Sequence, residues 1–179
     1  WLNAKNEDKL KGFGISACAT CDGFFFKDKI VAVVGGGNSA AEEALFLTNF
    51  ATKVFLIHRK DKLRSEKILQ DRLKKNPKIE FLWNKKVEEY LGDKNLSSVL
   101  LSDTLTNEKI ELNIDGLFVA IGHDPATEIF KGKLEMDNEG YIITKPDSTQ
   151  TNVMGVFAAG DVKDKIYRQA VTAAGMGCM

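Results

Sequence analysis

Two cysteines at CxxC spacing are the residues best suited to chemistry in this sequence. Ala and Thr separate Cys18 from Cys21, and Asp22 follows directly. Thiols at this spacing close a small disulfide and reopen it by exchange, and the setting lowers a thiol pKa into the reactive range. Asp22 is placed either to move the proton that a leaving thiolate needs or only to shape the turn before Gly23. The spacing predicts a redox-active dithiol.

Half of a zinc site and a chemically inert pair are the two alternative interpretations of these cysteines. A structural zinc ion needs four ligands, which usually come in two closely spaced pairs. Only Cys178, His58 and His123 remain in the sequence, and they are scattered. We therefore expect no metal site. With three cysteines in all, the chain fits a reducing, cytoplasmic setting better than a secreted disulfide framework.

A glycine-rich turn lies a short distance after the dithiol. Gly35-x-Gly37-x-x-Ala40 follows the β-branched run 30–34 and opens an apparent helix over 39–50. In this pattern the first glycine permits a tight turn, the second lets a phosphate approach the backbone, and the small third residue lets helix pack on strand. The free N–H groups of the helix N-terminus attract the pyrophosphate. The turn predicts a dinucleotide site, although glycine turns also serve simply as connections.

A basic loop at the end of the next strand indicates which dinucleotide is bound. An NAD site usually carries an acidic residue about 20 residues after the glycines, where it binds the ribose 2′-hydroxyl. This sequence has His58, Arg59 and Lys60 there, followed by Arg64. Guanidinium groups bind a 2′-phosphate that a carboxylate would repel. The loop therefore favours NADP(H) over NAD(H), with a merely solvated basic loop as the alternative.

The elements that must position these motifs alternate between strand and helix, which predicts an α/β fold with a Rossmann-like parallel sheet. We expect strands at 30–34, 53–57, 79–83 and 117–121, helices at 39–50 and 63–75, and an antiparallel hairpin from 98–103 and 109–114. Residues 1–17 are expected to be a connecting segment. The composition of the sequence changes near Thr127, where we place a domain boundary. The run 155–161 is expected to form a short strand.

The composition excludes some classes of function. The chain has 179 residues, with 25 basic and 25 acidic side chains, so it lacks the broad positive charge of a nucleic-acid binder. It has no apolar run of the roughly 18 residues that a bilayer span needs, and no secretory signal opens it. It starts at Trp1 and stops within a small-residue stretch. We therefore expect an internal piece of a longer protein that binds neither nucleic acid nor membrane.

Several short motifs in order resemble the bacterial low-molecular-weight thioredoxin reductases, class II pyridine nucleotide-disulphide oxidoreductases. The matching stretches are Cys18-Ala-Thr-Cys-Asp-Gly-Phe-Phe, Val34-Gly-Gly-Gly-Asn-Ser-Ala, Ile57-His-Arg-Lys-Asp-Lys-Leu-Arg64, Val119-Ala-Ile-Gly-His, Phe157-Ala-Ala-Gly-Asp-Val and Tyr167-Arg-Gln-Ala170. They cover nearly the whole chain.

The resemblance implies a homodimeric two-domain flavoenzyme whose FAD domain is interrupted by an NADPH domain that carries the dithiol. Residues 1–9 would be the tail of a missing FAD segment, 10–127 the NADPH domain, and 128–179 the start of the returning FAD-binding α/β segment. The two domains would rotate relative to each other about hinges near 10–17 and 122–130. Without half of the FAD site, we expect these 179 residues alone not to turn over.

The resemblance also implies a role for each matching residue. Cys21 would meet the flavin, Cys18 would attack thioredoxin, and Asp22 would be the acid or base. Phe24 and Phe25 would receive an aromatic side chain of thioredoxin, with ordinary core packing as the alternative. The cofactor-binding residues would be Gly35, Gly37, Asn38, Ser39, Ala40, His58, Arg59, Lys60, Arg64, Ile121 and Gly122 for NADP(H), and Gly160, Asp161, Arg168, Gln169 and Ala170 for FAD.

Two further functions compete with this interpretation. One is the flavoprotein component of an alkyl hydroperoxide reductase, whose motif between the cysteines tends to differ from Ala19-Thr20. The other is a regulatory nucleotide-binding module without catalysis, against which the CxxC argues. In one respect the chain departs from the thioredoxin reductases: Phe13 stands where they carry a basic residue that contacts thioredoxin. We expect Cys178, among small residues near the end of the chain, to serve packing only.

Overall fold

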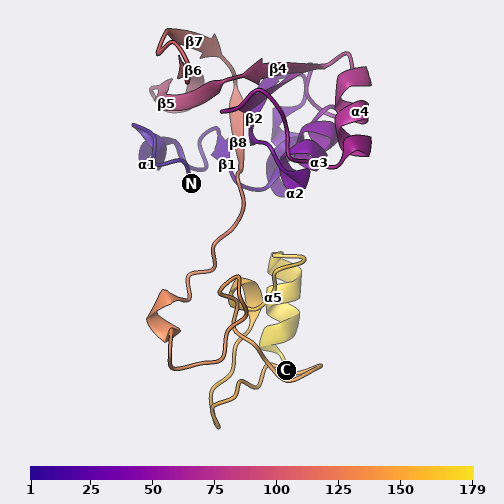
Figure 1. The fold of residues 1–179 in the computed structure, drawn as a ribbon, viewed down its shortest axis with the longest axis vertical. Helices are drawn as coiled ribbons and strands as arrows, with labels where there is room; N and C mark the ends of the chain where they lie inside the picture. Colours follow the sequence, from indigo (N-terminus) through magenta and orange to yellow (C-terminus); the bar gives the residue numbers. More distant parts are fainter. The chain divides into compact units, whose positions relative to one another are not determined.

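The computed structural model describes residues 1–179 and divides the chain into two compact units, Trp1–Gly122 and His123–Met179 (Figure 1). The division falls a few residues before the boundary expected near Thr127. The Thr127 side chain is buried, and its hydroxyl donates to the Gly140 carbonyl 2.6 Å away, within the second unit. No helix in residues 1–179 is long and apolar enough to cross a bilayer.

A five-stranded parallel sheet forms the centre of the first unit and confirms the expected α/β fold. Its order is β1 (Ile15–Ser16), β8 (Gly116–Ala120), β2 (Ile30–Gly35), β3 (Lys53–His58) and β4 (Ile79–Trp83). Strands β2, β3 and β8 are rich in Val, Leu, Ile and Phe because both of their faces are covered. Their carboxyl ends meet at one edge, which is where the glycine turn leaves the sheet.

Helices cover one face of this sheet and a smaller sheet covers the other. The helices are α2 (Ala19–Asp22), α3 (Asn38–Leu47) and α4 (Lys67–Lys75), which contribute to one buried cluster with Val31 and Val33. An antiparallel sheet of β5 (Lys85–Gly92), β6 (Leu96–Asp103) and β7 (Lys109–Asn113) joins a second cluster with Ala32 and Ile57. Alternate residues of β2 and β3 thus point to opposite cores.

Residues 1–17 are not the connecting segment that the sequence suggested. They contain α1 (Glu7–Leu10) and β1, which pairs in parallel with β8. Leu10 and Ile15 are fully or almost fully buried in the second cluster. Glycines on both sides of Phe13 suggested a loop, but the apolar residues on either side of that turn bury against the sheet. The first unit includes this segment as an integral part.

Two other elements differ from expectation. Helix α4 begins at Lys67 rather than near residue 63, because the loop before it is attached to the glycine turn by the Arg64 N–H, which donates to the Gly36 carbonyl at 2.7 Å. The expected hairpin exists as β6 and β7, but a third strand, β5, precedes it. Charged residues make up half of β5, so its sequence carries little strand signal.

The second unit holds the 3₁₀ helices η2 (Glu128–Phe130) and η3 (Gly160–Val162) and the helix α5 (Ala170–Gly177). The strand expected at 155–161 is wrong: the segment makes only an isolated bridge between Gln150 and Phe157. Phe157 is largely exposed there, and one bridge is too little pairing to sustain a strand. Cys178 lies beyond the end of α5 and is exposed, so its expected role in packing is also wrong.

Candidate dinucleotide site and redox disulfide

The glycine turn between β2 and α3 needs each of its glycines for a different reason. A Cβ on Gly35 would lie 2.3 Å from the Ala120 carbonyl oxygen and 2.6 Å from the Ala40 Cβ. A Cβ on Gly36 would lie 2.2 Å from the His58 ring. A Cβ on Gly37 would meet nothing within 4 Å. The first two glycines permit close packing, whereas Gly37 keeps open space in front of the helix N-terminus.

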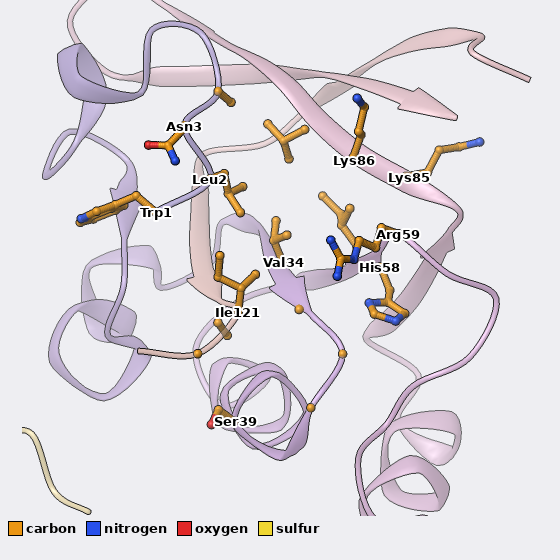
Figure 2. A pocket seen from close by; sticks show the side chains of 18 of the residues that line it. Trp1, Leu2, Asn3, Val34, Ser39, His58, Arg59, Lys85, Lys86 and Ile121 are labelled. Atoms are coloured by element: carbon orange, nitrogen blue, oxygen red, sulfur yellow. The ribbon is translucent and has the colours of Figure 1, made fainter. Parts of the chain in front are cut away.

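That open space belongs to a cavity of about 710 Å³ at the carboxyl edge of the parallel sheet (Figure 2). Five segments of the first unit line it: the first residues of the chain, the glycine turn, the end of β3 with the basic loop, the start of β5, and the end of β8 with the two residues after it. The residues that the sequence predicted and that the structure brings together here are Gly35, Gly37, Ser39, His58, Arg59, Arg64, Ile121 and Gly122.

Three predicted residues stand apart from this lining. Ala40 is fully buried beneath Gly35, in the packing role that the pattern gives its third position. Lys60 is exposed on the loop without lining the cavity. Asn38 interacts with the basic loop: its Oδ1 accepts the Glu66 N–H at 2.9 Å, and its Nδ2 donates to the Glu66 carboxylate at 3.4 Å. Asn38 therefore helps to hold the loop against the turn.

His58 closes the base of the cavity as a neutral ring. Its side chain is buried, and its Nε2 has no hydrogen-bond partner in the structure. Burial lowers the pKa of His58, and the nearby Arg64 and Arg59 lower it further against backbone hydrogen bonds that favour the charged form. At neutral pH the ring is therefore uncharged, and the positive charge of the site comes from arginine and lysine side chains.

Two contributions to the cavity were missed by sequence reasoning. Lys85 and Lys86 on β5 add positive side chains, although Lys85 is paired with Asp103 and Lys86 lies 2.9 Å from Glu88. The first four residues of the chain form a further wall. Neither contribution follows a recognised spacing. A strand pattern over β5 could have indicated Lys85 and Lys86, but the charged residues of β5 weaken that pattern.

This arrangement fits a dinucleotide phosphate. The ten-residue helix α3 presents its N-terminus beside Gly37, where the orphan N–H groups and the helix dipole favour a pyrophosphate. Arg59 and Arg64 line the same cavity, and guanidinium groups suit a 2′-phosphate. The His58 ring lies against the same cavity. Donors and cations thus surround a space that is large enough for a ligand.

The dithiol lies elsewhere on the same unit, at the start of α2. Cys18 and Cys21 form a disulfide with their Cα atoms 5.3 Å apart. Cys18 is the N-cap of α2, and its Sγ accepts the Cys21 N–H at 3.2 Å and lies 3.3 Å from the Thr20 hydroxyl. Cys21 is exposed and Cys18 is partly exposed. Neither cysteine is among the residues that line the cavity.

Aromatic side chains project to the surface just after the disulfide. Phe24 is 67% exposed and Phe25 is 76% exposed. Phe24 makes only edge contacts, with ring centroids 6.5 Å from Phe25 and 6.1 Å from Phe50. Core packing, the alternative explanation for Phe24 and Phe25, is therefore wrong.

Asp22 is partly buried, and its N–H donates to the Cys18 carbonyl at 3.1 Å.

The predicted FAD residues gather around a loop in the second unit. Gly160 has a φ of +73° and opens η3, where Asp161 is exposed. Arg168, with a φ of +50°, precedes Gln169, whose capping box starts α5 at Ala170.

Asp164 organises this loop, and sequence reasoning did not single it out. Its buried carboxylate accepts the N–H groups of Ile166, Tyr167 and Arg168 and the Thr172 hydroxyl at 2.9–3.0 Å. Burial raises the pKa of Asp164, but these hydrogen bonds outweigh burial and leave the pKa below its ordinary value. The loop is therefore held by an ionised side chain.

Comparisons with known proteins agree with this geometry. The chain is 58% identical to a thioredoxin reductase of Rickettsia felis, in an alignment that covers 100% of this chain and 59% of that protein. It is 55% identical to a thioredoxin reductase of Streptomyces clavuligerus, covering 99% of this chain and 55% of that protein. The chain thus spans less than two thirds of the length of these curated relatives.

A solved structure is similar over the same extent. The thioredoxin reductase from Streptococcus pyogenes MGAS5005 matches with a TM-score of 0.91 and 43% identity, over 99% of this chain and 58% of that one. A family model described as pyridine nucleotide-disulphide oxidoreductase matches residues 2–177. With its cavity, its glycine turn and its CxxC disulfide, this chain belongs to the pyridine nucleotide-disulphide oxidoreductase family.

Proposed function

We propose that the intact protein is an NADPH-dependent flavoprotein that reduces the disulfide of thioredoxin through Cys18 and Cys21. The observation that carries this proposal is the presence, on one unit, of a cation-lined cavity at a glycine turn and a separate, exposed CxxC disulfide. The similar proteins in Rickettsia felis and Streptomyces clavuligerus are named thioredoxin reductases, which favours this function over that of a peroxide-reductase component.

The cavity would bind NADPH through contacts of different kinds. The Gly35–Gly37 turn and the N-terminus of α3 bind the pyrophosphate, and Arg59 and Arg64 pair with the 2′-phosphate. The Asp161–Ala170 loop and parts of the intact protein beyond this chain would hold FAD, which would supply two-electron transfer between nicotinamide and disulfide when bound. Because one 2′-phosphate distinguishes NADPH from NADH, the two arginines determine the preference.

The dithiol performs the exchange step. In the reduced state the Cys18 thiolate attacks one sulfur of the partner's disulfide, forms a mixed disulfide and releases the other partner sulfur as a thiolate. Asp22 is placed in sequence to supply the proton to that leaving thiolate. The Cys21 thiolate then attacks Cys18, which restores the Cys18–Cys21 disulfide and releases the reduced partner. Two electrons leave the pair and two thiols appear on the partner.

The exposed Phe24 and Phe25 would receive the partner beside this disulfide. We infer a cytoplasmic setting, because a dithiol that is cycled by NADPH works in a reducing compartment, and a homodimer as the intact assembly. The 179-residue chain on its own is expected not to turn over, and flavin that co-purified with it would contradict this.

Turnover by the intact protein tests the proposal. With NADPH, thioredoxin and a disulfide dye, we expect NADPH oxidation that depends on thioredoxin and is lost in Cys18→Ser and in Cys21→Ser. Replacing both Arg59 and Arg64 by alanine should lower kcat/KM for NADPH far more than for NADH. No thioredoxin-dependent turnover in the wild type would refute the activity, and an unchanged NADPH/NADH preference would refute the role of the arginines.

A further inference from the structure

The first four residues form a wall of the dinucleotide cavity that belongs to no recognised motif. Trp1, Leu2, Asn3 and Ala4 all line the cavity. In Figure 2, Trp1 and Leu2 lie toward Ile121, whereas Arg59 lies across the cavity from them. An irregular segment can serve as a binding wall only if something holds it in one conformation, because a loose segment would lose entropy on binding.

The Glu7 carboxylate holds this segment. Its Oε1 accepts the Leu2 N–H at 2.9 Å, and its Oε2 accepts the Asn3 N–H at 2.9 Å. The Tyr90 hydroxyl also donates to Oε1, at 3.2 Å. Glu7 is only 4% exposed, so these three donors satisfy a buried charge. Hydrogen bonds to an ionised acceptor are stronger than neutral ones, and each backbone donor would be left unsatisfied without it.

The support behind Glu7 is rigid. Tyr90 is fully buried on β5, and burial together with the Glu7 charge raises its pKa well above the ordinary value, so its hydroxyl remains a donor. The segment also pairs with β5 through its backbone: the Lys5 N–H donates to the Glu88 carbonyl and the Tyr90 N–H donates to the Lys5 carbonyl, each at 3.0 Å. Glu7 thus connects the cavity wall to a fixed strand.

We propose that Glu7 is a positioning residue for the dinucleotide, because its carboxylate holds the backbone of Leu2 and Asn3 as a wall of the cavity. The inference rests on the proposed function, in which this cavity binds NADPH. Since this wall lies across the cavity from Arg59, Glu7 supports features that NADP(H) and NAD(H) share. Its loss weakens the binding of both nucleotides by a similar factor and leaves the preference between them to Arg59 and Arg64.

Glu7→Gln in the intact protein is the direct test. A glutamine keeps one acceptor oxygen but presents an NH₂ group where the carboxylate had its second acceptor, so at least one backbone N–H loses its partner. Losing such a hydrogen bond corresponds to a rise in Kd of about five- to tenfold. By calorimetry with NADP⁺ and with NAD⁺, we expect both Kd values to rise by that factor and their ratio to stay within about twofold. The KM for NADPH should rise while kcat at saturation is unchanged.

Asn6→Gly is the matched control. The Asn6 side chain donates to the Glu89 carboxylate at 3.1 Å and to the Tyr90 carbonyl at 3.0 Å, and its φ of +65° suits glycine. This variant removes two hydrogen bonds from the same segment without touching Leu2 or Asn3, so nucleotide binding should not change. If it weakens binding as much as Glu7→Gln does, or if Glu7→Gln lowers only the melting temperature, Glu7 is merely structural and the proposal is wrong.

Hydrogen exchange in the wild type gives a second measurement that does not depend on a folded variant. Saturating NADP⁺ should slow amide exchange in residues 1–4, and unchanged exchange there would overturn the proposal. The outcomes also distinguish a failure of the proposed function from a failure of the role assigned to Glu7. A wild-type protein that binds neither nucleotide overturns the proposed function along with this inference. A wild type that binds both, with a Glu7→Gln variant that binds them equally well, overturns only the role of Glu7.

Discussion

Replacing Gly35 and Gly37 one at a time by alanine should separate folding from nucleotide binding within a single turn. At Gly35 the new Cβ would lie 2.3 Å from the Ala120 carbonyl oxygen and 2.6 Å from the Ala40 Cβ. Overpacking typically costs about 1–3 kcal/mol, and the upper end applies here because the obstacle is backbone of the neighbouring strand. For a protein of this size, about 3 kcal/mol corresponds to a fall in Tm of roughly 6–12 °C.

Gly37→Ala should leave the stability of the fold nearly unchanged and weaken nucleotide binding instead. Its Cβ would meet nothing within 4 Å, and Gly37 has a φ of −96°, which any residue can adopt. The change in unfolding free energy should therefore stay within about 1 kcal/mol. The same Cβ would occupy the space through which a pyrophosphate approaches the backbone, so the Kd for NADP⁺ should rise at least tenfold, or about 1.4 kcal/mol.

Urea denaturation followed by circular dichroism, together with calorimetry on NADP⁺, would measure both effects on the intact protein. Gly35→Ala is the control, because it gives the loss of unfolding free energy that a packing defect causes. Gly37→Ala is the variant that tests the placement of the nucleotide. If Gly37→Ala binds NADP⁺ as tightly as the wild type, no phosphate approaches this glycine and the placement of the nucleotide is wrong. If instead it loses as much stability as Gly35→Ala, the packing argument is wrong.

Three further predictions concern other parts of the chain. The double variant Phe24→Ala, Phe25→Ala should change the unfolding free energy by less than about 0.5 kcal/mol, since both rings are exposed. It should raise the KM for thioredoxin in steady-state assays. An unchanged KM would mean that the partner binds elsewhere. The Lys85 ammonium, together with the backbone N–H groups of Leu105 and Thr106, lowers the pKa of Asp103 to about 2, below its value in the unfolded chain. The Asp103 carboxylate therefore stabilises the fold above about pH 4 and loses this effect as the pH falls toward 2. In acid titrations the stability difference between wild type and Asp103→Asn should shrink over that range, and a constant difference would contradict it. Asp164→Ala leaves the backbone N–H groups of Ile166, Tyr167 and Arg168 without their acceptor. The intact variant should therefore retain less flavin than the wild type when its absorbance is compared with protein content, and equal flavin content would refute this role.

Much of the parallel sheet could be predicted from the sequence because its strands are short runs of Val, Leu, Ile and Phe. The expected strands at 30–34, 53–57, 79–83 and 117–121 correspond to β2, β3, β4 and β8. A strand buried on both faces needs such a run whatever surrounds it. Where burial is partial, the strand signal is weaker: half of the residues of β5 are charged, and its pairing with β6 makes it a strand.

The start of α4 shows the same limit. The apolar pattern from residue 63 onward suggested a helix, but Leu63 turns inward as part of the loop and Arg64 is attached to Gly36. A contact with a residue far away in sequence therefore decided where the helix begins. The expected strand at 155–161 failed for the converse reason, because apolar residues alone do not make a strand without neighbours to pair with.

The sequence by itself predicted the chemistry that we propose for this protein: a redox-active dithiol at Cys18 and Cys21, a glycine turn suited to phosphate, and a basic loop. Each of these depends on spacing within a few consecutive residues, which chain geometry alone constrains. Only the tertiary structure decided which residues share a cavity. Parallel pairing brought the glycine turn and Arg59 to one edge of the sheet, and buried hydrogen bonds to Glu7 placed the first residues of the chain opposite them. Such long-range contacts leave no local pattern, because they depend on how distant segments pack.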